Sequence, residues 1–227
     1  MRAKTACAML VLGTALLGAH PGPARAQTAQ APAGEDAYGT LLRRAGMSRA
    51  RGAAGAPVTV YEVADFQCPF CAEFANETFE RIDSAYIRPG TVQWVFVNLP
   101  LTMHMNAFQA AEAALCAGGV GDKFWKMHQR LYRSQAEWTG AADPHALFLR
   151  YAREAGVPGP AYSACVRSER VWPVILRDAT YAAAAHIEGT PTYIIGTEVV
   201  AVGAKTFEEW KPILDKAVQD AATKKKP

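Results

Sequence analysis

The chain has 227 residues, of which 50% are hydrophobic, and it carries 24 basic and 21 acidic side chains. This length and composition suffice for one well-packed domain or for one domain with a large insertion. The net charge of +3 falls to zero once a predicted signal sequence is removed, so the chain lacks the basic excess of a nucleic-acid-binding protein.

The N-terminus has the pattern of a secretory signal. A basic start precedes an apolar run from Ala6 to Ala19, which is too short to span a bilayer, and Ala24-Arg25-Ala26 is an A-x-A cleavage site. Residues 1–26 are therefore predicted to be a signal peptide that is cleaved near Ala26. This predicts a periplasmic or otherwise extracytoplasmic protein, in which disulfides persist.

Residues 27–56 are predicted to be an N-terminal lead-in with a weak amphipathic helix from Asp36 to Met47. The alternating segment from Pro57 to Phe66 predicts a strand, and because both of its rows are mostly apolar it is expected to be central and covered on both sides. A helix from Cys68 to Ala85 and a buried strand from Thr91 to Asn98 follow. The order strand, helix, strand indicates a parallel pair.

The first chemical motif is Cys68-Pro69-Phe70-Cys71 at the predicted strand-to-helix junction. At a helix start, unpaired backbone N–H groups and the helix dipole stabilise a thiolate, so Cys68 is predicted to be the attacking sulfur. Cys71, one turn further on, is predicted to be the resolving thiol. Pro69 suits the first helical turn. The alternatives are half of a zinc site, for which no second ligand pair follows and no metal is expected, and an inert structural disulfide.

Glu62 is an anomaly in this buried strand. Six residues before Cys68, its carboxyl group is expected to lie beneath the helix start near Cys71, where burial raises its pKa. Such a group can take up and return the proton of the resolving thiol. The alternative is an ordinary strand carboxylate that reaches the surface.

Residues 104–187 read as helical throughout. One predicted helix, from Asn106 to Ala117, is expected to stop at Gly118-Gly119, and Asp122 is expected to cap the next helix, which ends at Arg133. Cys116 and Cys165 lie on two of the predicted helices. They form either a second disulfide that clamps this region or two buried free thiols.

The last part of the chain returns to strands. Gly189-Thr190-Pro191-Thr192 leads into two hairpin-like strands, and proline at a strand start is compatible with a cis peptide bond. A closing helix from Thr206 to Ala222 has a capping box formed by Thr206 and Glu209. Pro212 conflicts with so early a start, so the helix begins later or is kinked. Residues 224–227 are predicted to be a solvated basic tail.

Together these features resemble the DsbA-like branch of the thioredoxin superfamily. The resemblance rests on the C-x-x-C after a strand, the Thr-Pro segment before a strand, and the helical stretch between them. It implies an α/β fold, a thioredoxin-like mixed sheet built from residues 57–103 and 188–223, with an inserted all-helical domain at 104–187. It further implies a cis Pro191 beside Cys68 and a buried acid at Glu62.

The resemblance also implies how the site works. Thr190 offers backbone groups to an extended substrate segment, as in β-augmentation, and Pro69 and Phe70 are assigned to the same substrate-binding surface. The expected function is an exported thiol:disulfide oxidoreductase that introduces disulfides into cysteine-containing exported clients. It acts as a monomer without a cofactor and is re-oxidised by a membrane redox partner. The alternatives are a reductase or isomerase and a peptide-binding, chaperone-like module with a structural disulfide.

Overall fold

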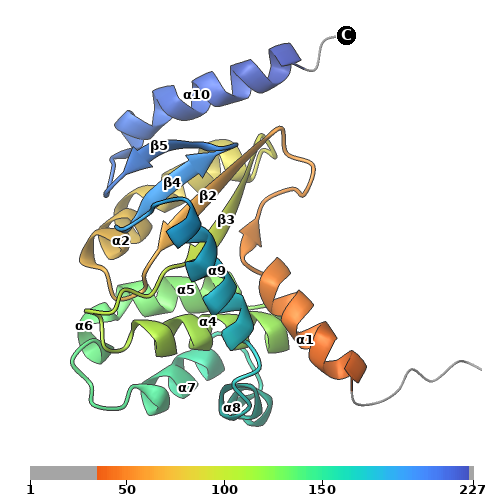
Figure 1. The fold of residues 1–227 in the computed structure, drawn as a ribbon, viewed down its shortest axis with the longest axis vertical. Helices are drawn as coiled ribbons and strands as arrows, with labels where there is room; N and C mark the ends of the chain where they lie inside the picture. Colours follow the sequence, from red (N-terminus) through yellow and green to blue (C-terminus); the bar gives the residue numbers. More distant parts are fainter. Residues whose placement is uncertain (1–34, 225–227) are drawn as a thin grey trace, which may run out of the picture. The chain divides into compact units, whose positions relative to one another are not determined.

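The computed structural model describes residues 35–224, so the predicted signal peptide and the residues after Lys224 lie outside the described part. A five-stranded mixed sheet in the order β1-β3-β2-β4-β5 forms its centre (Figure 1). Only β2 and β3 are parallel, and the other neighbours are antiparallel. The strands are β1 (Ala50–Arg51), β2 (Val58–Ala64), β3 (Val92–Asn98), β4 (Thr192–Ile195) and β5 (Glu198–Val202).

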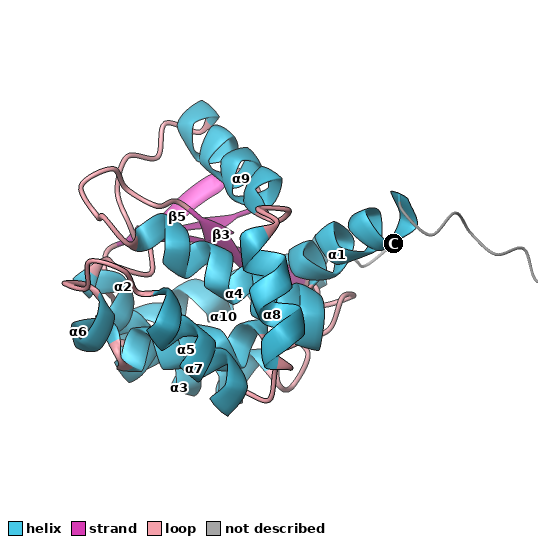
Figure 2. Cartoon of the chain, turned by 90° about the horizontal axis from the view of Figure 1, so that it is seen from below, coloured by secondary structure: helices cyan, strands magenta, loops and turns pink. Residues whose placement is uncertain are grey.

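Helices surround this sheet and fill the long connection between β3 and β4. The longer ones are α1 (Glu35–Met47), α4 (Ala107–Gly121), α5 (Phe124–Arg133), α7 (His145–Glu154), α8 (Gly159–Arg167), α9 (Trp172–Ala184) and α10 (Phe207–Lys224), and the short α6 covers Gln135–Trp138. Helices α4 to α8 pack together on one side of the molecule, with α9 leading back to the sheet (Figures 1 and 2). This arrangement confirms the predicted thioredoxin-like sheet with a helical insertion.

Strand β2 is the central strand, as predicted. It pairs with β3 along its whole length and with β4 from Val60 to Val63, which places Glu62 opposite Phe96 and Tyr193. Most of its side chains are buried, but Tyr61 is 40% exposed. The prediction that the strand is covered on both sides was therefore wrong at Tyr61.

The segment after the C-x-x-C is helical from Pro69 to Ile87, close to the predicted range. It is not one regular helix. The α-helical segments α2 (Pro69–Glu73) and α3 (Phe79–Ile82) alternate with the π-helical segments η1 (Phe74–Thr78) and η2 (Asp83–Ile87). The aromatic side chain of Phe74 is buried in the sheet core, where it stacks on Trp94 with ring centroids 5.8 Å apart.

Helix α4 runs past the two glycines that were expected to end it. A Cβ atom at Gly118 would lie 2.9 Å from the Cβ of Ser48, and one at Gly119 would lie 2.8 Å from Leu41. The glycines therefore allow α1 and its following turn to approach α4 closely, and they do not stop the helix. The helix ends at Asp122, which has a left-handed φ of 54° and so closes α4. Its predicted role as the cap of the next helix was wrong.

The N-terminal part of the described chain packs against the rest of the domain, whereas the sequence predicted a lead-in. The predicted helix is present as α1, which packs on α4. The sequence did not predict the short edge strand β1, which pairs with β3. Between them the buried Arg49 forms an ion pair with Asp178 of α9 and donates to the carbonyl of Phe96 at 3.0 Å.

The closing helix α10 begins where the capping box predicted. The carboxylate of Glu209 accepts from the backbone N–H of Thr206 at 2.8 Å, and the Thr206 hydroxyl accepts from the Glu209 N–H at 3.3 Å. Pro212 lies inside the helix, which starts early despite it. Trp210 is fully buried against the sheet. Within residues 35–224, no helix combines the length and the apolar character needed to cross a membrane.

Candidate active site

Cys68 lies at the start of helix α2, four residues after the end of β2. It is the N-cap residue, with extended backbone angles, and Pro69 occupies the first turn. The N–H of Cys68 donates to the carbonyl of Asp65 at 3.1 Å, which closes the turn between strand and helix. The residue is 4% exposed, Cys71 is fully buried, and Phe70 between them is 58% exposed.

The Thr190–Pro191 segment meets this turn from the other end of the chain. The Thr190–Pro191 peptide bond is cis. The thiol of Cys68 donates to the carbonyl of Thr190 at 3.3 Å, across a sequence separation of 122 residues. The structure thus brings together Cys68, Thr190 and Pro191, which the sequence analysis assigned to one site.

The two free thiols of the described chain differ in acidity. The hydrogen bond from the Cys71 thiol contributes most to lowering the pKa of Cys68 to about 6, against the effect of burial, and the Thr190 side chain and the backbone N–H groups of Cys71 and Phe70 lower it further. Burial raises the pKa of Cys71 well above its usual value, as does the neighbouring Cys68 sulfur. The sulfur of Cys68 is therefore the more acidic of the two, and at neutral pH it is largely a thiolate.

Glu62 lies on β2 within the core and is fully buried. Its Oε2 accepts a hydrogen bond of 2.7 Å from the indole N–H of Trp94, while within the described chain Oε1 has no hydrogen-bond partner. Burial raises the pKa of Glu62 to about 7, and its charge adds to the raised pKa of Cys71. A carboxyl group that titrates near neutral pH beside a buried thiol can exchange a proton with it.

The sequence analysis missed the polar contacts that hold the active-site turn. The buried carboxylate of Asp65 accepts from the backbone N–H groups of Gln67 at 2.7 Å and Leu101 at 2.8 Å. It also lies 2.7 Å from Nδ1 of His104. These contacts tie the loop after β3 to the residues just before Cys68. The pattern Asp-x-Gln is typical of a turn, but no local signal names the partners on the distant loop.

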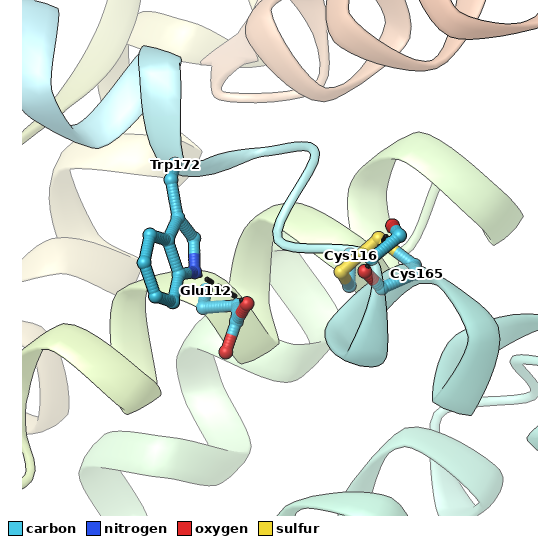
Figure 3. The surroundings of a disulfide bond; sticks show 5 residues. Glu112, Cys116, Cys165 and Trp172 are labelled. Carbon is cyan, nitrogen blue, oxygen red and sulfur yellow. Dashed lines mark hydrogen bonds between the residues drawn. A yellow bond between two sulfur atoms is a disulfide. The ribbon is translucent and has the colours of Figure 1, made fainter.

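The second cysteine pair is a disulfide within the helical insertion. The sulfur atoms of Cys116, on α4, and Cys165, on α8, are 2.01 Å apart (Figure 3). One turn earlier on α4, Glu112 accepts a hydrogen bond of 2.7 Å from the indole N–H of Trp172. Burial raises the pKa of Glu112. Among residues 35–224, no group of three or more His, Cys, Asp or Glu side chains is placed to hold a metal ion.

Comparisons with known proteins identify the family of the chain. A family model described as Thioredoxin matches residues 44–216. The Na(+)/H(+) antiporter NhaA 3 of Salinispora tropica is 34% identical over 146 residues, which cover 64% of this chain and 21% of that protein. The chain thus spans about a fifth of the length of this relative.

Two further matches cover most of both partners. The probable disulfide bond formation protein D of Bacillus anthracis is 25% identical over 167 residues, covering 72% of this chain and 75% of that protein. The crystal structure of alpha-DsbA1 from Wolbachia pipientis superposes with a TM-score of 0.68 at 21% identity, covering 78% of this chain and 94% of that one. The chain therefore belongs to the thioredoxin family.

Proposed function

We propose that the protein is an exported oxidase that introduces disulfides into other exported proteins. The observation that supports oxidation of clients, rather than their reduction, is the low pKa of Cys68, at about 6. A thiolate that is stable in the reduced protein favours reduction of the enzyme's own disulfide. The pair then tends to pass its disulfide to a client with two ordinary thiols.

The exchange has two steps. A client thiolate attacks the Cys68 sulfur of the Cys68–Cys71 disulfide, which forms a client–Cys68 disulfide and releases the Cys71 sulfur. The second client thiolate then attacks the client sulfur of this mixed disulfide, and Cys68 leaves as the thiolate. The client loses two electrons and two protons, and the enzyme disulfide gains the two electrons. In the reverse direction, Cys71 attacks the mixed disulfide.

We assign to Glu62 the role of protonating the sulfur of Cys71. Because the pKa of Cys71 is raised well above its usual value, the sulfur released in the first step takes up a proton. Glu62 has a pKa of about 7 and is therefore protonated in a large fraction of molecules at neutral pH. We assign it the transfer of this proton to Cys71; one of the two client protons then restores the proton of Glu62, and the other goes to solvent.

The client is expected to lie across the outer face of the turn. The Thr190 carbonyl accepts a hydrogen bond from the Cys68 thiol, and Pro191 follows it in the chain. We assign to Thr190 the backbone pairing with an extended client segment. Pro69 and Phe70 complete the assigned surface, and the exposed ring of Phe70 suits an apolar client side chain.

Turnover requires a partner that re-oxidises the pair. By analogy with the DsbA-like branch, we assign this role to a membrane redox protein. The proposed location is the periplasm or another extracytoplasmic compartment, after removal of residues 1–26. The proposed active form is the monomer.

Two measurements test the oxidase. The first is the reduction potential of the Cys68/Cys71 pair, obtained by equilibrating the mature protein with glutathione buffers. A value above about −180 mV supports the oxidase, whereas one near about −270 mV overturns it in favour of a reductase. The second uses Cys71→Ser, which is expected to accumulate mixed disulfides through Cys68 with exported clients. If none accumulate, the mechanism is wrong.

A reductase or isomerase is the second candidate. One observation favours it, because Pro69 and Phe70 place no histidine or cation between the cysteines to stabilise the thiolate further. Scrambled ribonuclease separates the two cases. An isomerase restores its activity from the reduced form of this protein, whereas an oxidase acts on reduced ribonuclease from the disulfide form.

A further inference from the structure

Side chains of the helical insertion donate hydrogen bonds to three backbone carbonyls of the active-site turn. The hydroxyl of Tyr132, in the last turn of α5, donates to the carbonyl of Asp65 at 3.3 Å. The side-chain amide of Gln135, the first residue of α6, donates to the carbonyls of Phe66 at 2.8 Å and Cys68 at 3.0 Å. These carbonyls belong to the residues that lead into the attacking cysteine and to that cysteine itself.

The Gln135 amide is suited to this place because its two N–H groups can serve two carbonyls at once. The Cys68 carbonyl also accepts the first helical bond, from the N–H of Ala72 at 3.2 Å. The carbonyl of Phe66 lies just before Gln67 in the chain, and that of Cys68 just after it. One side chain from the insertion therefore fixes the backbone on both sides of Gln67.

This arrangement also affects the charge next to the Cys68 sulfur. A backbone carbonyl oxygen carries partial negative charge, which opposes a neighbouring thiolate. A donor that points at that oxygen offsets its charge and brings the positive end of an N–H dipole into the turn. Without Gln135, both carbonyls lose a donor, and within the described chain the Cys68 carbonyl keeps only the N–H of Ala72.

We propose that Gln135 is a positioning residue for Cys68, which through the carbonyls of Phe66 and Cys68 both fixes the turn and favours the thiolate. The helical insertion thereby sets the reactivity of a sulfur that lies in the thioredoxin-like part. The proposal rests on Cys68 being the attacking thiol of the proposed function, and it holds for oxidation and reduction alike.

The test compares three variants of the mature protein. Gln135→Leu removes both donors. Gln135→Glu keeps the size of the side chain but replaces the donors with a negative charge. Gln129→Leu is the matched control. Gln129 is an exposed residue of the neighbouring helix α5, and within the described chain no side-chain hydrogen bond links it to the active-site turn.

The measurement is the rate of iodoacetamide alkylation of Cys68 between pH 4 and 9, with the modified residue mapped by mass spectrometry. Mapping separates alkylation of Cys68 from alkylation of Cys71. Among the neighbouring groups, Glu62 titrates in the same range, at about 7. Cys71, Tyr132 and Tyr193 have raised pKa values and stay protonated in most of it. The melting temperature of each variant is recorded in parallel.

We expect Gln135→Leu to raise the midpoint for Cys68 by about one pH unit, a tenfold change in its acidity. Gln135→Glu should raise it further, because it adds a negative charge, and Gln129→Leu should leave it unchanged. If both Gln135 variants lower the melting temperature but keep the wild-type midpoint, the residue is only structural and the proposal is overturned.

The wild-type protein separates this inference from the proposed function. If wild-type Cys68 has no midpoint near 6, the assignment of Cys68 in the proposed function fails first. If the wild-type midpoint is near 6 and the Gln135 variants share it, only the role of Gln135 fails. Should Gln135→Leu not fold, Gln135→Glu carries the test, because it preserves the shape of the side chain.

Discussion

The two cysteine pairs have similar surroundings but different chemistry. Each lies near a buried glutamate that accepts a 2.7 Å hydrogen bond from a tryptophan N–H, Glu62 from Trp94 and Glu112 from Trp172. Burial raises the pKa of both acids. Yet Cys68 and Cys71 are free thiols, whereas Cys116 and Cys165 are joined.

The difference comes from where each sulfur lies on its helix. Cys68 caps α2, so backbone N–H groups without helical partners are available to its thiolate. Cys116 lies within α4 and Cys165 within α8, where the backbone N–H groups are used by the helices. A buried acid is thus not sufficient for redox chemistry, and the helix start supplies what the second pair lacks.

The largest expected effect distinguishes the pairs by activity. Cys68→Ser should reduce disulfide exchange with a reduced client to the uncatalysed rate, because it removes the nucleophile. The double variant Cys116→Ala/Cys165→Ala should keep most of the activity at a temperature where it is folded. Oxidation of reduced ribonuclease measures both. If the double variant were as inactive as Cys68→Ser, the second pair would be part of the reaction.

The next effect distinguishes them by stability. The Cys116–Cys165 disulfide spans 49 residues of sequence, so Cys116→Ala/Cys165→Ala should lower the free energy of unfolding by about 4 kcal/mol. Urea unfolding of the oxidised proteins measures this loss. A loss below about 1 kcal/mol would mean that the bond does not clamp the insertion.

Glu62→Gln should stabilise the oxidised protein at high pH. The pKa of Glu62 is raised to about 7, so the folded state holds this proton more tightly than the unfolded state. This contribution is fully present below pH 4.5 and is lost as the pH rises through 7. The gain should therefore be absent at pH 4 and reach about 3 kcal/mol at pH 8.

Urea unfolding at both pH values measures the gain, with Glu112→Gln as the matched control. The same Glu62→Gln variant should slow exchange at Cys71. Glu112→Gln, in contrast, should leave exchange unchanged. Equal stabilisation of the two variants with no change in exchange would argue against a proton-transfer role for Glu62.

An effect of comparable size is expected in the pH dependence of the reduced protein. The pKa of Cys68 is lowered to about 6, so its thiolate stabilises the folded state above that pH. The stability of the reduced protein should rise between pH 6 and the pKa of an unfolded cysteine, about 8.5, and should be lost as the pH falls through 6. Thermal unfolding of reduced wild-type protein and Cys68→Ser checks this, since the variant should lack this rise.

The sequence predicted the fold and the position of the two candidate reacting thiols at a helix start because both depend on local patterns. A strand followed by C-x-x-C and a helix is readable within about 20 residues, and so is the capping box of α10. The position of each cysteine in the first helical turn then predicted which thiol attacks and which one resolves. These patterns need no knowledge of distant partners.

The failures arise where a residue acts through a distant one. Gly118 and Gly119 are typical of a helix end, but here they make room for α1, which lies about 70 residues earlier. The edge strand β1 has two residues and no periodicity of its own. Gln135 lies 67 positions from Cys68 and looks like any surface glutamine of a helix start. Only the packed structure identifies such residues.

The order of the four described cysteines along the chain has a consequence for biogenesis. Cys116 is joined to the cysteine that follows it, Cys165, and the proposed redox disulfide would likewise join Cys68 to the next cysteine, Cys71. The pairings neither cross nor enclose one another, so each cysteine finds its partner in the order in which the chain emerges. An N-to-C nascent chain can close both bonds consecutively without passing through a mispaired intermediate. Sequential pairing of this kind requires no rearrangement of disulfides during maturation.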